Sequence, residues 1–405
     1  MKSRKKILRL FSRLNIGGPA IHVVNLSVGL PRFGYDTLLV VGSPDESEGT
    51  LDGFAREQGA ELVVIPSFQA KISPWKDLLT LVKLIRLMRK ERPDIVHTHT
   101  FKAGLLGRLA ARITGVPVVI HTYHGHLLTG YGSSLKASII RLIETGLGFL
   151  TDHMIAVSDQ VAKDLVSSHV TNHSKMSSVE LGFDMRKIQE DLSRPSFLRE
   201  DLCIPQSAFT VGIVGRLVPV KAVDLFLTAL CPLLETNPDL HLLVLGDGTE
   251  RKALELLARV LTGHQSRIHF TGWRRPVTQD LPDLDLCICS SKNEGTSVSI
   301  IEAVVARVPV MSTRVGGMAD LLGNGRWGQL IDSDPFALRS AVEQHIDLMK
   351  NTNDPAAKLY RERIHRRVDE AAEHFQNRFS VERLLTDVDG TYRKLLNGSA
   401  DAHPQ

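Results

Sequence analysis

Two glutamates flank a polar turn within residues 290–303. Glu294 and Glu302 stand eight residues apart, after the apolar run 284–289 and around the start of the apolar run 300–305. The turn therefore lies between a predicted buried strand and a predicted helix. Ligands bind at the carboxyl ends of strands in open α/β sheets, and the free N–H groups of a helix start favour an anion. Carboxylates at this place can accept hydrogen bonds from hydroxyl groups of a ligand.

A second turn of the same kind carries two cations. The apolar run 209–214 predicts a strand, which Gly215, Arg216 and Lys221 follow, and a predicted helix begins at Ala222. Arginine offers a fork of donors and lysine a compact charge, which suits a diphosphate. Without an anion, two cations near a helix start would be mildly unfavourable against the helix dipole. The turn therefore indicates an anion site.

Each glutamate also has a structural interpretation. Ser299 and Glu302 have the spacing of a capping box, in which Glu302 would be the third helical residue. Glu294 could be an exposed turn residue. Their occurrence together with Arg216 and Lys221 favours a binding site over both interpretations.

Histidines gather where two further predicted strands end. They are His97, His99, His121, His124 and His126. A metal site is one interpretation, but the spacing alternates along extended chain, so hydrogen bonding to a polar substrate is favoured. A structural role for each single histidine remains the default. Asp283-Leu284-Asp285 resembles a divalent-ion motif, but it leads into an apolar strand and is interpreted as strand entry. The sequence predicts no metal.

A pair of glycines follows the first predicted strand, 6–14. Gly17 and Gly18 let the backbone approach a ligand closely and leave helix N–H groups free. A plain tight turn is the alternative. There is no G-x-G-x-x-G, so a dinucleotide cofactor is not supported.

Short strands alternate with helices along most of the chain, which predicts βαβ units and parallel sheets. A length of 405 residues is too great for one core, so two domains are expected. The sequence predicts a first domain 1–185, a polar linker 186–207 and a second domain 208–378. After these it predicts a helix 379–397 that packs back toward the first domain and a disordered tail 398–405.

Composition excludes several classes of protein. Hydrophobic content of 43% and charged content of 23% are ordinary for a globular protein, and no apolar run is long enough to span a membrane. The start is a poor signal peptide, and four cysteines without metal spacing suit a reducing cytoplasm. Residues 1–185 carry a formal charge of +6 and residues 186–405 one of −2. The basic first half and the amphipathic helix 77–90 suit an anionic surface such as phospholipid.

Several of these stretches together resemble family 4 retaining glycosyltransferases. They are I-G-G-P-A, D-I-V-H-T-H-T-F-K-A-G-L-L-G, V-V-I-H-T-Y-H-G-H, V-S-D-Q-V, G-I-V-G-R-L-V-P-V-K, L-G-D-G, F-T-G-W, and E-G-T-S-V-S-I-I-E-A followed by V-G-G. The resemblance covers roughly residues 5–395. It implies an α/β fold of two Rossmann-like domains facing across a cleft (GT-B), with C-terminal helices.

The resemblance also implies roles for particular residues. Arg216 and Lys221 would neutralise a diphosphate leaving group, Glu302 would accept hydrogen bonds from the ribose, and Glu294 would contact the transferred sugar. His121 would lie at the donor sugar. The implied catalytic set is Glu294, His121, Arg216 and Lys221; the donor-binding set is Gly17, Gly18, Gly215, Arg216, Lys221, Gly295, Thr296 and Glu302; the acceptor-side candidates are His97, His99, His124 and Lys102.

The implied activity is retaining transfer of a hexosyl or N-acetylhexosaminyl group from a nucleotide diphosphate donor to a hydroxyl of a cell-envelope or lipid-linked glycan. UDP is the expected nucleotide, with GDP next. No metal, cofactor or nucleic acid is expected as a partner. The protein is expected in the cytoplasm, where it would bind peripherally to the inner face of the plasma membrane. Its expected process is polysaccharide biosynthesis. Two alternatives remain: a GT-B nucleotide-sugar epimerase, which would isomerise the donor without an acceptor, and an inactive scaffold, which would bind no nucleotide.

Three positions depart from the family pattern. Ala222 and Arg307 stand where glycine is usual, and Ser297 stands where proline is common. A residue other than glycine at 307 would have to adopt a positive φ, at a cost of about 1 kcal/mol.

Overall fold

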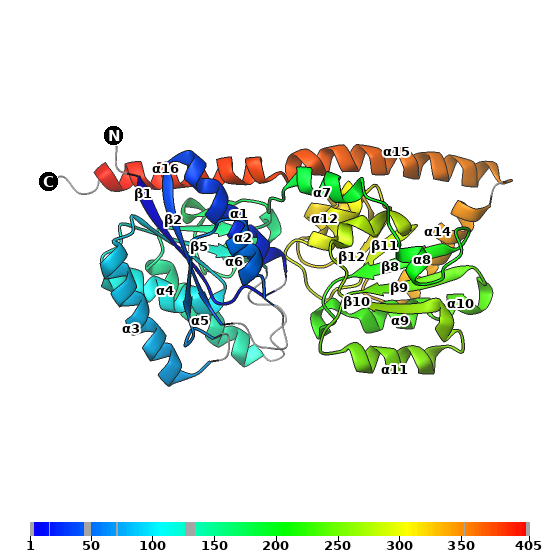
Figure 1. The fold of residues 1–405 in the computed structure, drawn as a ribbon, viewed down its shortest axis with the longest axis horizontal. Coiled ribbons are helices and arrows are strands. Elements are labelled where there is room, and N and C mark those ends of the chain that lie inside the picture. Colours follow the sequence, from blue (N-terminus) through cyan, green and yellow to red (C-terminus); the bar gives the residue numbers. More distant parts are fainter. Residues whose placement is uncertain are drawn as a thin grey trace. The chain divides into compact units, whose positions relative to one another are not determined.

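The computed structural model describes residues 4–15, 17–43, 50–69, 72–125, 134–351 and 353–401. The chain forms two compact units. Unit 1 contains Met1–Phe183 and Phe379–Gln405, and unit 2 contains Asp184–Arg378. Each unit is built around its own parallel sheet with helices on both faces (Figure 1). The expected α/β fold with two Rossmann-like sheets and C-terminal helices is confirmed, and the cleft between the two units stays a prediction.

Unit 1 has a seven-stranded sheet. In spatial order its strands are β3 (Leu62–Ile65), β2 (Tyr35–Gly42), β1 (Lys5–Phe11), β4 (Ile95–His99), β5 (Val118–Tyr123), β6 (His153–Ala156) and β7 (Met176–Ser178). The strand order reverses between β1 and β4, where Phe11 pairs with His99. Ligands bind at such a switch point because the loops after the two strands diverge.

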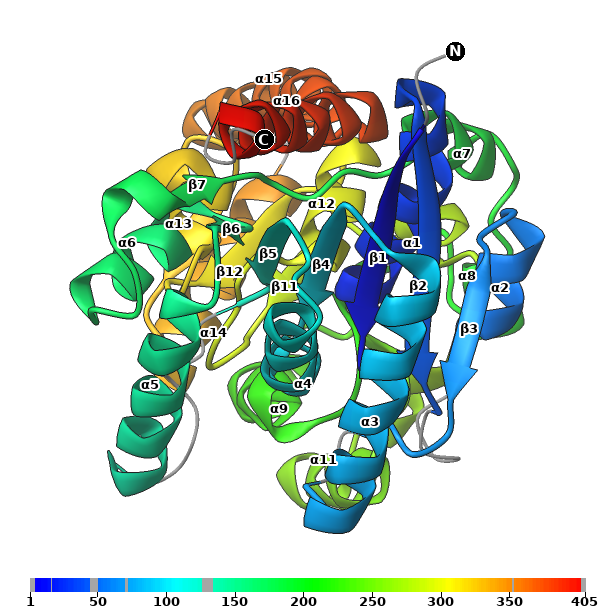
Figure 2. The ribbon, with the colours of Figure 1, turned by 90° about the vertical axis from the view of Figure 1, so that its left-hand side faces the viewer.

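Helices cover both faces of this sheet (Figure 2). They are α1 (Gly18–Gly29), α2 (Asp52–Glu57), α3 (Pro74–Glu91), α4 (Phe101–Ile113), α5 (Ser134–Phe149), α6 (Asp159–Ser167) and α16 (Val381–Asp401). Successive side chains of a strand point to opposite faces. Leu8 of β1 packs with Leu84 of α3. Its neighbour Ile7 packs with Leu26 of α1 and Leu385 of α16.

Unit 2 has a six-stranded sheet in the order β10 (Ile268–Gly272), β9 (Leu240–Leu245), β8 (Phe209–Val214), β11 (Leu286–Cys289), β12 (Val310–Thr313) and β13 (Gln329–Ile331). Its helices are α7 (Met185–Leu192), α8 (Leu198–Asp201), α9 (Val223–Leu230), α10 (Leu233–Thr236), α11 (Arg251–Leu261), α12 (Val298–Val305), α13 (Met318–Leu321), α14 (Pro335–Lys350) and α15 (Pro355–Arg378). Phe226 of α9, Leu254 of α11 and Val342 of α14 share one core. Here the strand order reverses between β8 and β11.

Segment 186–207 differs from the expected linker, because it holds most of α7 and all of α8 and belongs to unit 2. Buried Arg199 fixes it by donating to Asp285 Oδ2 over 3.1 Å, and Ser196 Oγ donates to Asp283 Oδ2 over 2.6 Å. The two aspartates of the D-x-D stretch are thus used at the strand entry, as the sequence indicates. The sequence pattern does not indicate these helices, because the segment is polar and contains two prolines.

The end of the chain returns to unit 1 as α16. The expected disordered tail, 398–405, begins inside this helix, which runs to Asp401, and residues 402–405 lie outside the described residues. No helix in the described ranges is both long enough and apolar enough to cross a bilayer.

Candidate functional site

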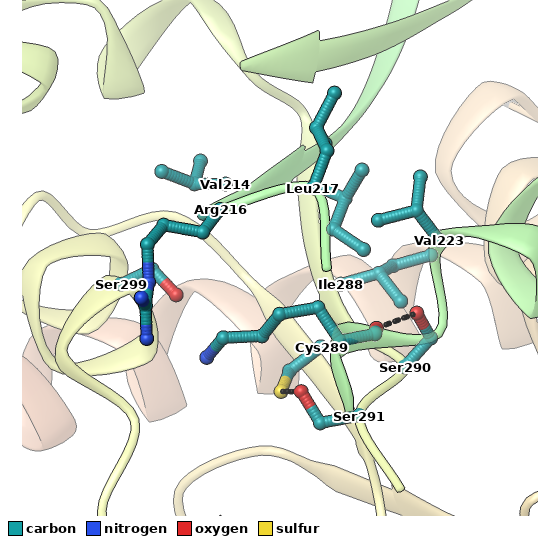
Figure 3. Close-up of a pocket in the computed structure, with 12 residues that line it drawn as sticks. Val214, Arg216, Leu217, Val223, Ile288, Cys289, Ser290, Ser291 and Ser299 are labelled. Atoms are coloured by element: carbon teal, nitrogen blue, oxygen red, sulfur yellow. Dashed lines mark hydrogen bonds between the residues drawn. The ribbon is translucent and has the colours of Figure 1, made fainter. Parts of the chain in front are cut away.

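The site in unit 2 lies at the switch point, where the turns after β8 and β11 meet. The two strands are hydrogen-bonded neighbours, with Ile213 opposite Ile288. Their turns enclose a small pocket (Figure 3) lined by Ile213, Val214, Gly215, Arg216, Leu217, Lys221, Val223, Ile288, Cys289, Ser290, Ser291 and Ser299. Ser290 ties the turns together, because its hydroxyl donates to the carbonyl oxygen of Ala222 over 2.8 Å. The structure therefore brings together the cation turn and the glutamate turn.

Glycines allow neighbouring loops to press against these turns. A Cβ on Gly246 would lie 1.9 Å from the carbonyl oxygen of Gly215, and a Cβ on Gly316 would lie 2.0 Å from that of Glu294. Both distances are impossible for real Cβ atoms. The L-G-D-G and V-G-G stretches thus buttress the pocket from the adjacent strands β9 and β12.

Lys221 and Glu294 form an ion pair within the pocket wall. Ser291 Oγ donates to the same oxygen, Glu294 Oε1, over 2.7 Å. Burial alone would lower the pKa of Lys221, but the adjacent Glu294 carboxylate more than offsets it, so the pKa lies above its ordinary value. Lys221 therefore carries a full positive charge at neutral pH, held in place by a carboxylate.

Arg216 is the second cation of the pocket. Among the described residues it has neither a hydrogen-bond nor an ion-pair partner, and its side chain extends toward Ser299 in the first turn of α12 (Figure 3). The N–H groups of that first turn have no intrahelical acceptors. An unpaired guanidinium facing a helix start is a suitable place for an anion.

Glu302 does not cap α12. The helix begins at Val298 after Ser297, so Glu302 is its fifth residue and no side chain caps the helix start. The capping-box interpretation is therefore wrong. Burial, with a smaller contribution from Asp191, raises the pKa of Glu302 to about 7. Its carboxyl group thus titrates near neutral pH, which is common for groups in binding sites.

The departures from the family pattern have visible structural consequences. Ala222 has a φ of 46° and Arg307 a φ of 60°, so both adopt the left-handed conformation that favours glycine. The N–H groups of Arg307 and Val308 bind the carbonyls of Val304 and Ala303, as in a Schellman motif. The expected positive φ at Arg307 is confirmed, and this conformation costs a residue other than glycine about 1 kcal/mol. Ser297 has a φ of −84°, close to that of proline, and adds no strain.

Unit 1 separates the predicted histidines onto different faces of its sheet. His121 lies within β5, is 1% exposed, and its Nδ1 is 2.8 Å from Thr98 Oγ1 on the face covered by α4. His97 lies on the opposite face, where its nitrogens are 2.7 Å from Thr122 Oγ1 and 2.6 Å from Tyr392 OH of α16. Both are held by neighbouring protein groups. In this structure neither side chain is presented to a ligand, unlike the expectation from the sequence.

His99 and His124 lie at the carboxyl edge of the sheet. Their rings stack with centroids 5.2 Å apart, and Nδ1 of His99 is 3.0 Å from Nε2 of His124. His22 of α1 contacts both rings edge-on. Burial lowers the pKa of His22 and His99 well below the ordinary value and that of His124 to about 3, so all three are neutral at neutral pH.

The remaining predicted residues of unit 1 surround this edge. Gly17 is the N-cap of α1 and Gly18 its first residue, with no side chain capping the helix start. Thr100, at the end of β4, has a φ of 67°, which is strained for a β-branched residue and is typical of functional sites. Lys102 is buried and ion-paired with Asp77 of α3 over 2.5 Å, so its charge ties α4 to α3.

Two family models match the chain. The Glycosyltransferase Family 4 model matches residues 16–187, and the Glycosyl transferases group 1 model matches residues 208–347. The chain belongs to glycosyltransferase family 4. The resemblance to family 4 glycosyltransferases is thus confirmed, and the chain is a glycosyltransferase, while retention stays a prediction.

Two relatives of this family 4 glycosyltransferase are bacterial glycosyltransferases. The UDP-Gal:α-D-GlcNAc-diphosphoundecaprenol α-1,3-galactosyltransferase of Escherichia coli is 28% identical over 270 residues, which cover 66% of this chain and 70% of that protein. The capsular polysaccharide biosynthesis glycosyltransferase CapM of Staphylococcus aureus is 26% identical over 385 residues, 93% of this chain and 97% of that protein. The crystal structure of Anabaena HepE with UDP-glucose has a TM-score of 0.77 at 20% identity and covers 96% of this chain and 99% of that chain. That likeness shows the fold alone.

Two residues that contact the predicted ones could not be found from the sequence pattern of this family 4 glycosyltransferase. His22 stands alone in a helix, and the only signal was a polar residue among the buried positions Ala20, Val23 and Val24. Ser291 is one of several hydroxyl residues after β11, and its bond to Glu294 becomes visible only in three dimensions.

Proposed function

We propose that the protein transfers a sugar, with retention, from a nucleotide diphosphate donor to a hydroxyl group of a glycan acceptor. The observation that carries this proposal is the ion pair of Lys221 with Glu294 beside Arg216, which has no partner in the described part of the chain. Breaking the bond between a sugar and a diphosphate develops negative charge on the leaving oxygen. Fixed cations and helix N–H groups at that oxygen stabilise the transition state.

In this proposal the cations perform the work that a divalent ion performs in other transferases. Arg216 and Lys221 bind the diphosphate, and the N–H groups of Gly295 and Thr296 bind the sugar or a phosphate. Glu294 accepts hydrogen bonds from the sugar hydroxyls. The departing phosphate takes the proton of the acceptor hydroxyl, so no protein base is required.

His124 replaces His121 as the proposed histidine at the donor sugar. His121 is fully buried against α4, whereas His124 directly follows the last residue of β5 and is half-buried. Gly17 and Gly18 contribute helix N–H groups at the same edge of the sheet. His99 stays an acceptor-side candidate. Lys102 and His97 are assigned structural roles, because Asp77 and the pair Thr122 and Tyr392 hold them.

UDP is the proposed nucleotide, and a hexose or N-acetylhexosamine the proposed sugar. The E. coli relative is named for UDP-galactose, and the Anabaena structure contains UDP-glucose. The experiment that tests the function is a nucleotide-release screen over UDP- and GDP-sugars with lipid-linked acceptors. Acceptor-dependent release supports transfer, whereas isomerisation of the donor without an acceptor, or no nucleotide binding at all, contradicts it.

We propose a lipid-linked or cell-envelope glycan as the acceptor, met at the inner face of the plasma membrane. Helices α3 and α5 flank α4 on one face of unit 1 (Figure 2). Helices between parallel strands run opposite to the strands, so the amino ends of α3 and α5 lie at the carboxyl edge that carries the site. Large apolar side chains are exposed there: Ile72, Trp75, Leu78, Leu79, Ile139 and Leu142. Exposed Lys76 and Arg141 accompany them.

The membrane surface makes a testable prediction. Trp75 is 78% exposed, and tryptophan favours the membrane interface. Trp75→Ala is expected to weaken binding to anionic phospholipid vesicles by about tenfold, on the scale of burying one large apolar side chain. Co-sedimentation with vesicles measures this. Val260→Ala, which removes an equally exposed apolar residue of α11 in unit 2, should leave vesicle binding unchanged; equal losses would contradict this docking surface.

Glu302 gives nucleotide binding a pH dependence. Its pKa is about 7 in the free site, and as a carboxylate it would accept hydrogen bonds from both ribose hydroxyls. The nucleotide then favours the ionised form, so affinity for UDP is full above the pKa and falls as pH drops through it, by up to about tenfold per unit. Calorimetry of UDP binding at several pH values measures the slope. In Glu302→Gln the part of the pH dependence that comes from Glu302 should disappear. The part that comes from the titration of UDP itself should remain, because it is the same for the variant and the unmodified protein.

A further inference from the structure

We propose that His22, His99 and His124 form a binding site for one transition-metal ion, Zn²⁺ above all, at the carboxyl edge of the unit 1 sheet. The three residues come from α1, from β4 and from the turn after β5. One ring nitrogen from each lies within 4.8 Å of the others. All three residues belong to unit 1. The proposal deepens the proposed function, in which His99 and His124 lie on the substrate side, but metal binding can be measured without any sugar transfer.

Unused hydrogen-bonding capacity is the first observation that points to a ligand. Nδ1 of His22, Nε2 of His99 and Nδ1 of His124 are each buried, and none has a hydrogen-bond partner among the described residues. A buried polar atom without a partner costs about 1–3 kcal/mol. Such atoms are rare in native proteins, and three on adjacent side chains require an explanation. By contrast, both nitrogens of neighbouring His97 have partners, so it is not part of the site.

The donor set selects the kind of ion. Three imidazoles without a carboxylate suit Zn²⁺ and its neighbours in the transition series, and they exclude Mg²⁺ and Ca²⁺, which prefer oxygen. The rings are neutral at neutral pH, which metal binding requires. In a tetrahedral site with Zn–N bonds of about 2.0–2.1 Å, ligand nitrogens are about 3.3 Å apart. The other nitrogens of the same two rings, Nδ1 of His99 and Nε2 of His124, hydrogen-bond each other over 3.0 Å, so an ion bound between them would replace this hydrogen bond.

The residues around the three histidines determine how tightly an ion would bind and from which side it would be accessible. Arg9 is a buried cation bound to Ser27, His97 and Tyr392, and its charge lowers the affinity for a dication. We therefore expect weaker binding than at a zinc finger. Three protein ligands leave a fourth position for water or for a substrate hydroxyl. His124 is the half-buried member of the three, so this position opens toward the carboxyl edge of the sheet.

The test is a metal titration of the full-length protein after chelator treatment. Co²⁺ serves as the probe, because its visible absorption reports tetrahedral nitrogen coordination, and Zn²⁺ is then added to displace it. One Co²⁺ per chain is expected. His99→Gln and His22→Asn, each in a separate protein, should weaken binding by more than about 100-fold, since loss of an outer-shell partner alone costs about 10–100-fold. His121→Asn is the matched control: it removes an equally buried histidine of β5 that faces the other side of the sheet.

Two measurements on the unmodified protein keep the proposal testable if a variant fails to fold. Zn²⁺ should raise the midpoint of thermal unfolding, because it binds the folded state, whereas Mg²⁺ should not. Zn²⁺ should also protect His124 from diethyl pyrocarbonate in peptide maps. The absence of a one-to-one Co²⁺ signal, an equal effect of Mg²⁺, or an equal loss in His121→Asn would overturn the site.

Discussion

Lys221→Ala is expected to lower kcat/KM for sugar transfer by about 100-fold or more, the scale of losing one oxyanion-type contact. Lys221 lies in the wall of the pocket, carries a raised pKa and is fixed by Glu294 and by the turn that Ser290 closes. Steady-state release of the nucleotide product measures the loss. Lys292→Ala removes an exposed lysine from the neighbouring turn and should leave transfer nearly normal.

Replacing Glu294, the partner of Lys221 in this ion pair, should affect turnover in the same way but UDP binding differently. Glu294→Gln is also expected to lower turnover by about 100-fold, because the sugar loses a carboxylate acceptor. The same change leaves Lys221 without its counter-charge, so the affinity for UDP should stay constant or increase. Calorimetry separates the two variants: Lys221→Ala weakens UDP binding, and Glu294→Gln does not. Near-normal turnover in both variants would show that the assigned roles are wrong.

Glu144→Ala is expected to destabilise the protein by about 3–5 kcal/mol, the cost of leaving one buried charge without its partner. Arg108 of α4 and Glu144 of α5 form an ion pair over 2.7 Å with both side chains fully buried, and Tyr123 OH donates to the same carboxylate. Urea unfolding measures the loss. Asp387→Ala breaks an exposed pair with Arg383 on α16 and should change stability by less than about 0.5 kcal/mol.

A double variant distinguishes lost charge from lost packing. Nη1 of Arg108 and Oε1 of Glu144 have no hydrogen-bond partner among the described residues, so the pair is incompletely satisfied. Replacing both residues by apolar ones, Arg108→Met with Glu144→Leu, should therefore recover most of the stability. If the double variant were as unstable as Glu144→Ala, packing of α5 rather than charge would explain the loss.

The closeness of Lys221 and Glu294 in unit 2 could be predicted from the sequence, for a physical reason. Lys221 and Glu294 both follow apolar strands, and the carboxyl ends of neighbouring parallel strands meet at one edge of a sheet. Residue type and strand position then suffice to bring a cation and a carboxylate together. The structure adds what the sequence cannot give: that the two bind each other in the free protein, and that Glu302 is the fifth residue of its helix rather than a cap.

The histidines of unit 1 show where such prediction ends. His97, His99 and His121 all lie in or at the end of strands, but a strand alternates its faces with a period of two residues. In the sheet, His121 of β5 stands opposite Thr98 of β4, one position beyond His97. The side chain of His121 therefore lies under α4, whereas that of His97 points to α16. His22 joins the group from α1, and no spacing along the chain connects it with β4. The pattern of a single sequence does not show which elements far apart in the chain contact each other.

The position of α16 has a consequence for the order in which the protein is made. The last helix of the chain supplies Leu384, Leu385 and Val388 to the apolar cluster that also contains Ile7 of β1. Domains are usually completed in the order of synthesis. Here unit 1 cannot bury this cluster until α16 has left the ribosome, whereas unit 2 is contiguous in the sequence and precedes α16. A stop codon before α16 would therefore leave unit 1 incomplete, although β1 is translated before the whole of unit 2.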